Sequence, residues 1–247
     1  MQKIYLDRKI EKSRLVLYLL ESSLAVFGIV MLVLALLKIG FENLPMGSRI
    51  SSALVAICLA FVPMLIEKIF RYRFPIMLHI IYVTYVFASV IVGSCFGVFR
   101  IDVLMMGEML GWYDKITHAV LGYILCIVAI YLGQIAKIWG KSIFGDILIL
   151  LAISMAYASI WEMYEFAVDH IIPGQSMQRN SLIDTMLDII SHFALTVVFI
   201  VQYVIEKCCK VNLGIAFMER NLSTGGRVAK KNQMPTSEDI TNNNQEQ

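Results

Sequence analysis

The sequence predicts an all-α membrane protein, a bundle of about six transmembrane helices. Of its 247 residues, 58% are hydrophobic and 16% are charged, whereas roughly a quarter of the residues in soluble domains are charged. Six apolar segments approach or exceed the roughly 20 residues that a membrane-crossing helix needs. The lysines and arginines also gather in alternate connections between these segments, as they do in multi-pass membrane proteins.

The predicted spans cover residues 19–39, 50–66, 75–98, 116–136, 146–168 and 183–205. The first span is too long for the apolar region of a signal peptide, and no small-residue cleavage site follows it. We therefore expect it to be retained as a helix.

The basic residues also predict the orientation. If the N-terminus is cytoplasmic, all but five of the 21 lysines and arginines lie on the cytoplasmic side, as the positive-inside rule requires. Both termini are then cytoplasmic, in a plasma or inner membrane. The chain divides into a leader (1–18), interfacial or simply solvated, a transmembrane domain (19–206) and a cytoplasmic tail (207–247). The tail becomes polar enough from about residue 221 to predict disorder.

Eight ionisable residues lie near the ends of the last three spans. Such groups are costly at membrane depth, so they usually face a bundle interior or a wet cavity and mark a functional site. In the predicted topology all of them lie in the outer leaflet, which indicates one shared site. They are Asp114, His118, Glu162, Glu165, Asp169, Asp184, Asp188 and His192.

Helical spacing places each group on a single face. Asp114 and His118 are four residues apart. The acids of the fifth span are separated by three and then four residues, and Asp184, Asp188 and His192 of the sixth by four and four. Residues three or four apart share one side of an α-helix. Three polar stripes at matched depth can therefore converge on one pocket.

Several of these residues also have a structural interpretation. Asp114 and Asp184 suit helix N-termini, where the dipole favours anions. Lys115 fits a snorkelling interface residue, which we favour, or a partner for an acid. His79, in the third span, fits a histidine whose hydrogen bonds are satisfied inside the bundle. Glu162, Glu165 and Asp188 have no such explanation.

The charges of this region do not balance. Lys115 and Arg179 offset two of the six acids, so four negative charges remain. Protons or a bound cation must neutralise them. Carboxylates with imidazoles suit Zn, Mn or Fe, and carboxylates with water suit Mg or Ca; a proton-sharing network is the alternative. The candidate metal ligands are His118, Glu162, Glu165, Asp184, Asp188 and His192, and Asp114 and Asp169 are candidates for catalytic proton transfer.

Three motifs carry a family resemblance over about residues 113–192. Asp114-Lys115-x-x-His118 followed by Arg179 and Asp184 resembles the VanZ-like membrane proteins. Trp161-Glu162-x-x-Glu165 followed by Asp184-Thr185-x-x-Asp188 more closely resembles the YjdF-type bacterial inner-membrane proteins. The resemblance implies a bacterial multi-pass membrane protein; its VanZ-like side is associated with glycopeptide resistance. Glu165 and Asp188 stand where VanZ-like proteins more often carry amides, which favours the YjdF-type assignment.

Three functions fit these observations. The first is a metal-dependent enzyme that acts at the outer leaflet on a lipid or lipid-linked substrate. The second is a cation- or proton-binding transport protein, although the deep acids occupy one leaflet only. The third is a polar cluster that only locks the helices together. Nucleic acid is not an expected partner, because the basic residues follow the topology, and the sequence leaves the oligomeric state open.

Overall fold

The structure is a computed structural model that describes residues 2–39, 46–70, 72–99, 111–171, 182–223 and 226–227. Arg179 and the tail residues 228–247 lie outside the described residues, so the expectations about them stay predictions. The helices are α1 (Gln2–Leu36), α2 (Met46–Phe70), α3 (Ile76–Val86), α5 (Trp112–Ile135), α6 (Ile143–Ile171), α7 (Leu182–Cys209) and α8 (Ile215–Leu222), and α3 continues as the π-helical segment η1 (Phe87–Cys95).

The predicted all-α fold is confirmed. In the part of the chain that the structure describes, six helices are long and apolar enough to cross a membrane, and α3 with η1 forms the third of them. Two strands of two residues each, β1 (Tyr72–Arg73) and β2 (Gly226–Arg227), form one antiparallel pair. The predicted leader is helical from Gln2 and runs without a break into the first span.

Local sequence explains where the elements begin and end. Pro75 lies directly before α3, where its fixed φ and missing N–H are tolerated. Lys38, Lys137 and Lys210 each follow a long helix with a left-handed backbone conformation. This is a common way to end a helix, and a cation there also interacts favourably with the helix dipole.

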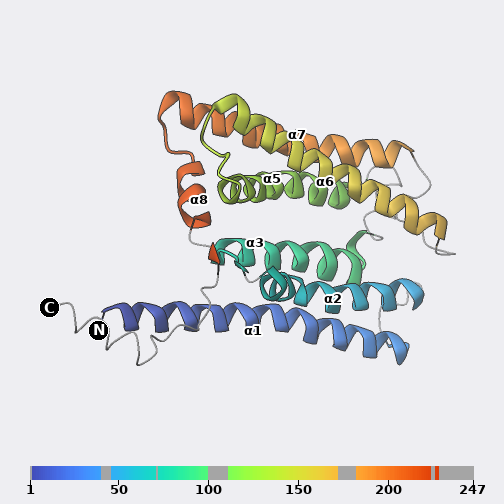
Figure 1. Cartoon of the computed structure of the whole chain (residues 1–247). Helices are drawn as coiled ribbons and strands as arrows, with labels where there is room; N and C mark the ends of the chain where they lie inside the picture. Colours follow the sequence, from blue (N-terminus) through green and yellow to red (C-terminus); the bar gives the residue numbers. More distant parts are fainter. Residues whose placement is uncertain are drawn as a thin grey trace.

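The helices form two layers (Figure 1). One layer contains α1, α2 and the third span, and the other contains α5, α6 and α7. Small residues bring α1 and α2 together: Ala53, Ala56 and Ala60 are completely buried, and Gly28 lies against Ala53 and Ile57. Close packing through small residues is typical of membrane helices.

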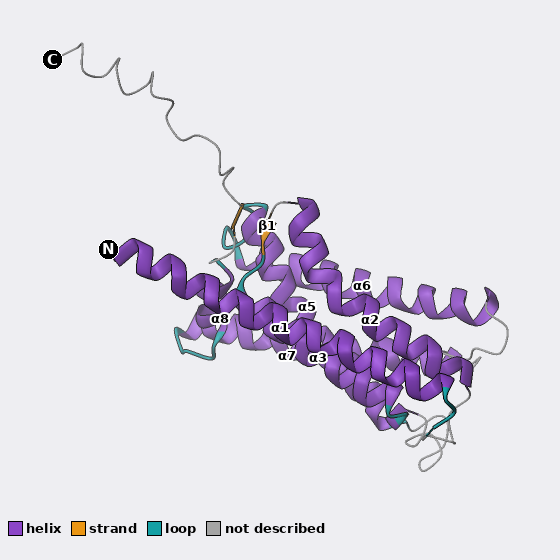
Figure 2. Cartoon of the chain, turned by 90° about the horizontal axis from the view of Figure 1, so that it is seen from below, coloured by secondary structure: helices purple, strands orange, loops and turns teal. Residues whose placement is uncertain are grey.

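The two layers meet along α5, which packs against both α3 and η1, while α8 bridges α3 and α5 at one end of the bundle. Figure 2 shows from below that most of the described chain is helical and that the long helices run roughly along one direction. Consecutive spans therefore run in opposite directions through the bundle. The beginnings of α5 and α7 lie with the end of α6 at one end of the bundle, and the beginnings of α1 and α3 lie at the other (Figure 1).

Candidate functional site

Lys115 is the centre of the site. Its Nζ lies 2.6 Å from Asp184 Oδ1, 2.6 Å from Asp188 Oδ1 and 3.4 Å from Asp114 Oδ2. Asp184 and Asp188 are buried, and the Lys115 side chain is 16% exposed. The favoured interpretation, a lysine snorkelling to the interface, was therefore wrong, and the alternative of a partner for acids is correct.

His118 lies beside this ion pair. Its Nε2 is 3.7 Å from Asp114 Oδ1 and 3.8 Å from Asp188 Oδ1. Asp114, His118 and Asp188 each offer one ligand atom, and these three atoms lie within 4.8 Å of one another. We call Asp114, Lys115, His118, Asp184 and Asp188 the acidic cluster. It joins α5 to α7, as their helical spacing predicts.

Glu162 and Glu165 bring α6 to the same region. Both are buried, and Glu165 is close enough to Glu162, Asp114 and Asp188 to interact with their charges. The indole Nε1–H of Trp161 donates to Glu165 Oε1 at 2.8 Å. Glu165 therefore faces the acidic cluster from the neighbouring helix, and the hydrogen bond from Trp161 orients its carboxyl group.

His192 lies on the same stripe as Asp188 but has other partners. Its Nε2 is 2.9 Å from Ser154 Oγ, which also lies 2.7 Å from Thr196 Oγ1. The ring is completely buried, and Nδ1 has no hydrogen-bond partner among the described residues. Hydroxyl groups of α6 and α7 thus orient His192. It is not part of the three-residue metal-ligand group found among the described residues.

Glycine permits this arrangement. A Cβ atom on Gly122 would overlap the backbone carbonyl of His192 and lie 2.9 Å from Thr196 Oγ1. Because α7 backbone stands in the way, α5 and α7 can approach this closely only without a side chain at position 122. Gly122 therefore sets the separation of the two helices that carry the acidic cluster.

Asp169, the last acid of the fifth span, is partly buried near the end of α6. It interacts with another residue, but it is not among the described residues that line the cavity described next. The structure thus places it at the edge of the site rather than at its centre.

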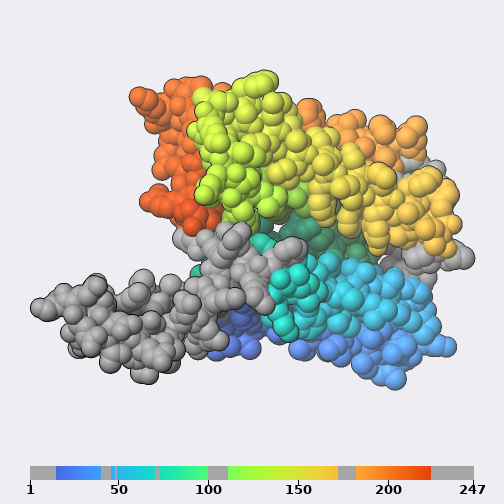
Figure 3. Space-filling model, viewed as in Figure 1, coloured from blue at the N-terminus to red at the C-terminus, as the bar shows by residue number. Residues whose placement is uncertain are grey.

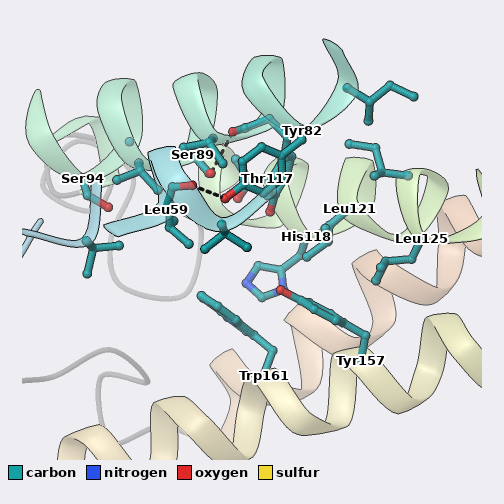
Figure 4. A pocket seen from close by; sticks show the side chains of 18 of the residues that line it. Leu59, Tyr82, Ser89, Ser94, Thr117, His118, Leu121, Leu125, Tyr157 and Trp161 are labelled. Atoms are coloured by element: carbon teal, nitrogen blue, oxygen red, sulfur yellow. Dashed lines mark hydrogen bonds between the residues drawn. The ribbon is translucent and has the colours of Figure 1, made fainter. Parts of the chain in front are cut away.

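A cavity of about 990 Å³ lies between the two layers, at the upper end of the range for ligand pockets. Most of its wall is apolar or aromatic, and Asp114, His118 and Glu165 lie at one end. Figure 4 shows His118 of α5 with Tyr157 and Trp161 of α6 on one side, and Tyr82 and Ser89 of the third span on the other.

The cavity is bounded by α2 on one side and α6 on the other. Among the described residues these two helices do not pack against each other, so the cavity lies where the layers separate. Figure 3 shows the surface hollowed between α2 (cyan) and α6 (yellow). A molecule could enter sideways from a lipid bilayer through such an opening.

The other end of the cavity holds a second ionisable group. His79 lines the cavity wall and lies between Glu21 of α1 and Glu67 of α2, with ring nitrogens 2.5 Å and 3.1 Å from their carboxylate oxygens. The expected satisfied histidine is confirmed. Its partners were missed, because Glu21 is a single acid within an apolar span and Glu67 lies just beyond the end of the predicted second span.

Comparison with known proteins now identifies the family. The family model described as "Predicted membrane protein (DUF2238)" matches residues 22–207. The chain belongs to this family. The match supports the YjdF-type resemblance, whereas the VanZ-like resemblance stays a prediction. A search of characterised proteins and of solved structures gives no match to this DUF2238 chain.

The DUF2238 match contains the whole acidic cluster together with Glu162, Glu165, His192, Glu67 and His79. Glu21 lies one residue before its first position. Family membership therefore establishes a membrane protein and covers both polar sites except Glu21. The chemistry of this DUF2238 protein has to be argued from its geometry.

Proposed function

We propose that the protein binds an amphiphilic, lipid-linked molecule and acts on its polar head group with a divalent cation. One observation carries this proposal: a single cavity joins a long apolar wall to Asp114, His118 and Glu165. An apolar chain would occupy the wall, and the head group would lie at the acidic cluster. A few convergent polar groups in a mainly apolar pocket are typical of ligand sites.

The proposed cation site consists of Asp114, His118 and Asp188. Two carboxylates and one imidazole suit Zn, Mn or Fe, whereas Mg is usually bound by oxygen atoms alone. A cation there would have to share Asp188 with Lys115, whose Nζ already lies 2.6 Å from Asp188 Oδ1. When bound, such a cation supplies a Lewis acid or an activated water.

Glu165 is the side chain we propose for proton transfer. It lines the cavity, and its Oε1 accepts a hydrogen bond from the Trp161 N–H, so a head group bound in the cavity would lie beside its carboxyl group. Asp114 and Asp169 are the acids that the sequence singles out for this task. Asp114 lines the cavity but belongs to the cation site, and Asp169 lies outside the described wall.

We also propose that the acidic cluster faces the outside of a bacterial inner membrane, with both termini cytoplasmic. The distribution of lysine and arginine supports this orientation. In a chain without other cysteines, a cysteine at exposed position 170 should react with an impermeant reagent added outside. Labelling at this position only from the cytoplasmic side would reverse the proposed orientation.

The cavity has a direct test in Leu125→Trp. Leu125 is buried and lines the wall. A Trp ring would displace about two methylene groups of a bound chain, at about 0.8 kcal/mol each, so amphiphile affinity should fall about tenfold. The measurement is the amount of lipid or lipid-linked molecule that co-purifies with the protein, determined by mass spectrometry.

Leu148→Trp is the matched control, because Leu148 lies on the exposed face of α6. It should leave the amount of bound amphiphile unchanged. Equal retention by both variants, or a wild-type protein free of any amphiphile, would contradict the proposal.

A second candidate function is cation or proton transport. The specific observation in its favour is the Glu21–His79–Glu67 group at the opposite end of the same cavity. Ionisable groups therefore lie near both ends of the bundle, which removes the objection that they occupy one leaflet only.

A further inference from the structure

We propose that Glu21, His79 and Glu67 form a proton-binding site that exchanges protons with the cavity. This proposal goes beyond the proposed function, because the site lies at the other end of the bundle and shares no residue with the acidic cluster. Glu21 and His79 are almost completely buried, and each of the three residues comes from a different span.

The hydrogen bonds of Glu67 fix its protonation state. Its Oε1 accepts from the backbone N–H of Phe74 at 2.6 Å, and its Oε2 accepts from the hydroxyl of Tyr18 at 2.9 Å. His79 Nε2 lies 3.1 Å from Oε1. With donors at both oxygens, Glu67 is a carboxylate. The hydrogen atom between His79 Nε2 and Glu67 Oε1 is therefore bonded to Nε2.

The other ring nitrogen then requires one more proton. His79 Nδ1 lies 2.5 Å from Glu21 Oε1. A neutral imidazole with hydrogen on Nε2 has a bare Nδ1, which cannot bond to a carboxylate because both atoms are acceptors. Either Glu21 is protonated and donates to Nδ1, or His79 is an imidazolium and donates to Glu21. In both cases Glu21 and His79 share a proton.

Glu21 can also bind a second proton. Its Oε2 is buried and has no hydrogen-bond partner among the described residues. With one shared proton the three groups still carry one negative charge, which is costly inside a membrane. A proton on Oε2 would neutralise them. The unpartnered oxygen is therefore an independent sign that this site takes up protons.

The cavity provides a route for exchange. His79 forms part of its wall, and hydroxyl side chains continue along it in Tyr82, Tyr85, Ser89 and Thr117. Figure 4 shows Tyr82 and Ser89 bonded to backbone carbonyls. Among the described residues, the other titratable groups that face the site are Tyr18 of α1 and Tyr82 of α3, and neither carries a positive charge.

Infrared difference spectroscopy between acid and alkaline pH tests the site in the purified full-length protein. Besides the bands of the other acids and histidines, the wild-type spectrum should contain bands of a protonated carboxyl or an imidazolium that disappear in both Glu21→Gln and His79→Gln. The matched control His170→Gln changes an exposed histidine of α6 and should keep them. A wild-type spectrum that neither Glu21→Gln nor His79→Gln alters, beyond the change seen in His170→Gln, would overturn the proposal.

Proton exchange between the site and the cavity is tested by a separate measurement. Transfer into deuterated water should shift the same bands in the wild type, and Leu125→Trp, which fills the cavity, should slow this shift while Leu148→Trp does not. An unchanged rate in Leu125→Trp would show that protons reach the site by another route. Amphiphile retention is measured separately, so failure of this proposal and failure of the proposed function give different results.

Discussion

Lys115→Met is expected to lower the free energy of unfolding by about 3–5 kcal/mol, because it leaves buried carboxylates without their counter-charge. The ammonium group lies 2.6 Å from both Asp184 and Asp188, and both acids are almost completely buried. Methionine keeps much of the length and the apolar contacts of the lysine side chain. The loss would appear as a lower denaturation temperature of the detergent-purified protein.

Two further variants show whether charge is the cause. Adding Asp184→Asn and Asp188→Asn to Lys115→Met removes the unpaired charges and should recover a large part of the stability. Lys141→Met changes an exposed lysine and should have little effect. A Lys115→Met protein as stable as the wild type would show that these acids are neutralised in another way.

Gly122→Ala should have the second largest effect, a loss of about 1–3 kcal/mol. The new methyl group would overlap the backbone carbonyl of His192, and backbone cannot move aside as a flexible side chain can. To relieve the overlap, α5 and α7 must separate, and this would also pull Lys115 away from Asp184 and Asp188. The same denaturation measurement detects the change.

Gly47→Ala is the matched control, because a Cβ atom there would meet nothing within 4 Å. Alanine is also the better helix former by about 1 kcal/mol, so this variant should be at least as stable as the wild type. If Gly122→Ala and Gly47→Ala behaved alike, the close approach of α5 and α7 would not matter for stability.

Much of the architecture could be predicted, because membrane spans depend on local composition. A run of about 20 apolar residues can cross a bilayer whatever its neighbours are. Helical periodicity likewise depends on spacing alone, so Asp114, Asp184 and Asp188 could be predicted to converge. Their meeting around Lys115 confirms that part of the reasoning.

The missed features depend on which helices pack together. Glu21 and Glu67 are single acids in apolar spans, and only the packing of α1, α2 and α3 brings them to His79. Ser154 is an unremarkable residue until α6 places its hydroxyl against His192. The two interpretations of Lys115 differed only in the direction of one flexible side chain, which sequence spacing does not determine.

We propose that Asp114, His118 and Asp188 hold a divalent cation at the end of the cavity. Elemental analysis of the purified protein measures this cation directly. The proposed site predicts about one Zn, Mn or Fe ion per chain in the wild type. It also predicts loss of the ion in Asp188→Asn and in His118→Ala, and retention in His170→Gln. A wild-type protein that holds none of these ions after incubation with each, or an ion that persists in Asp188→Asn, would contradict it.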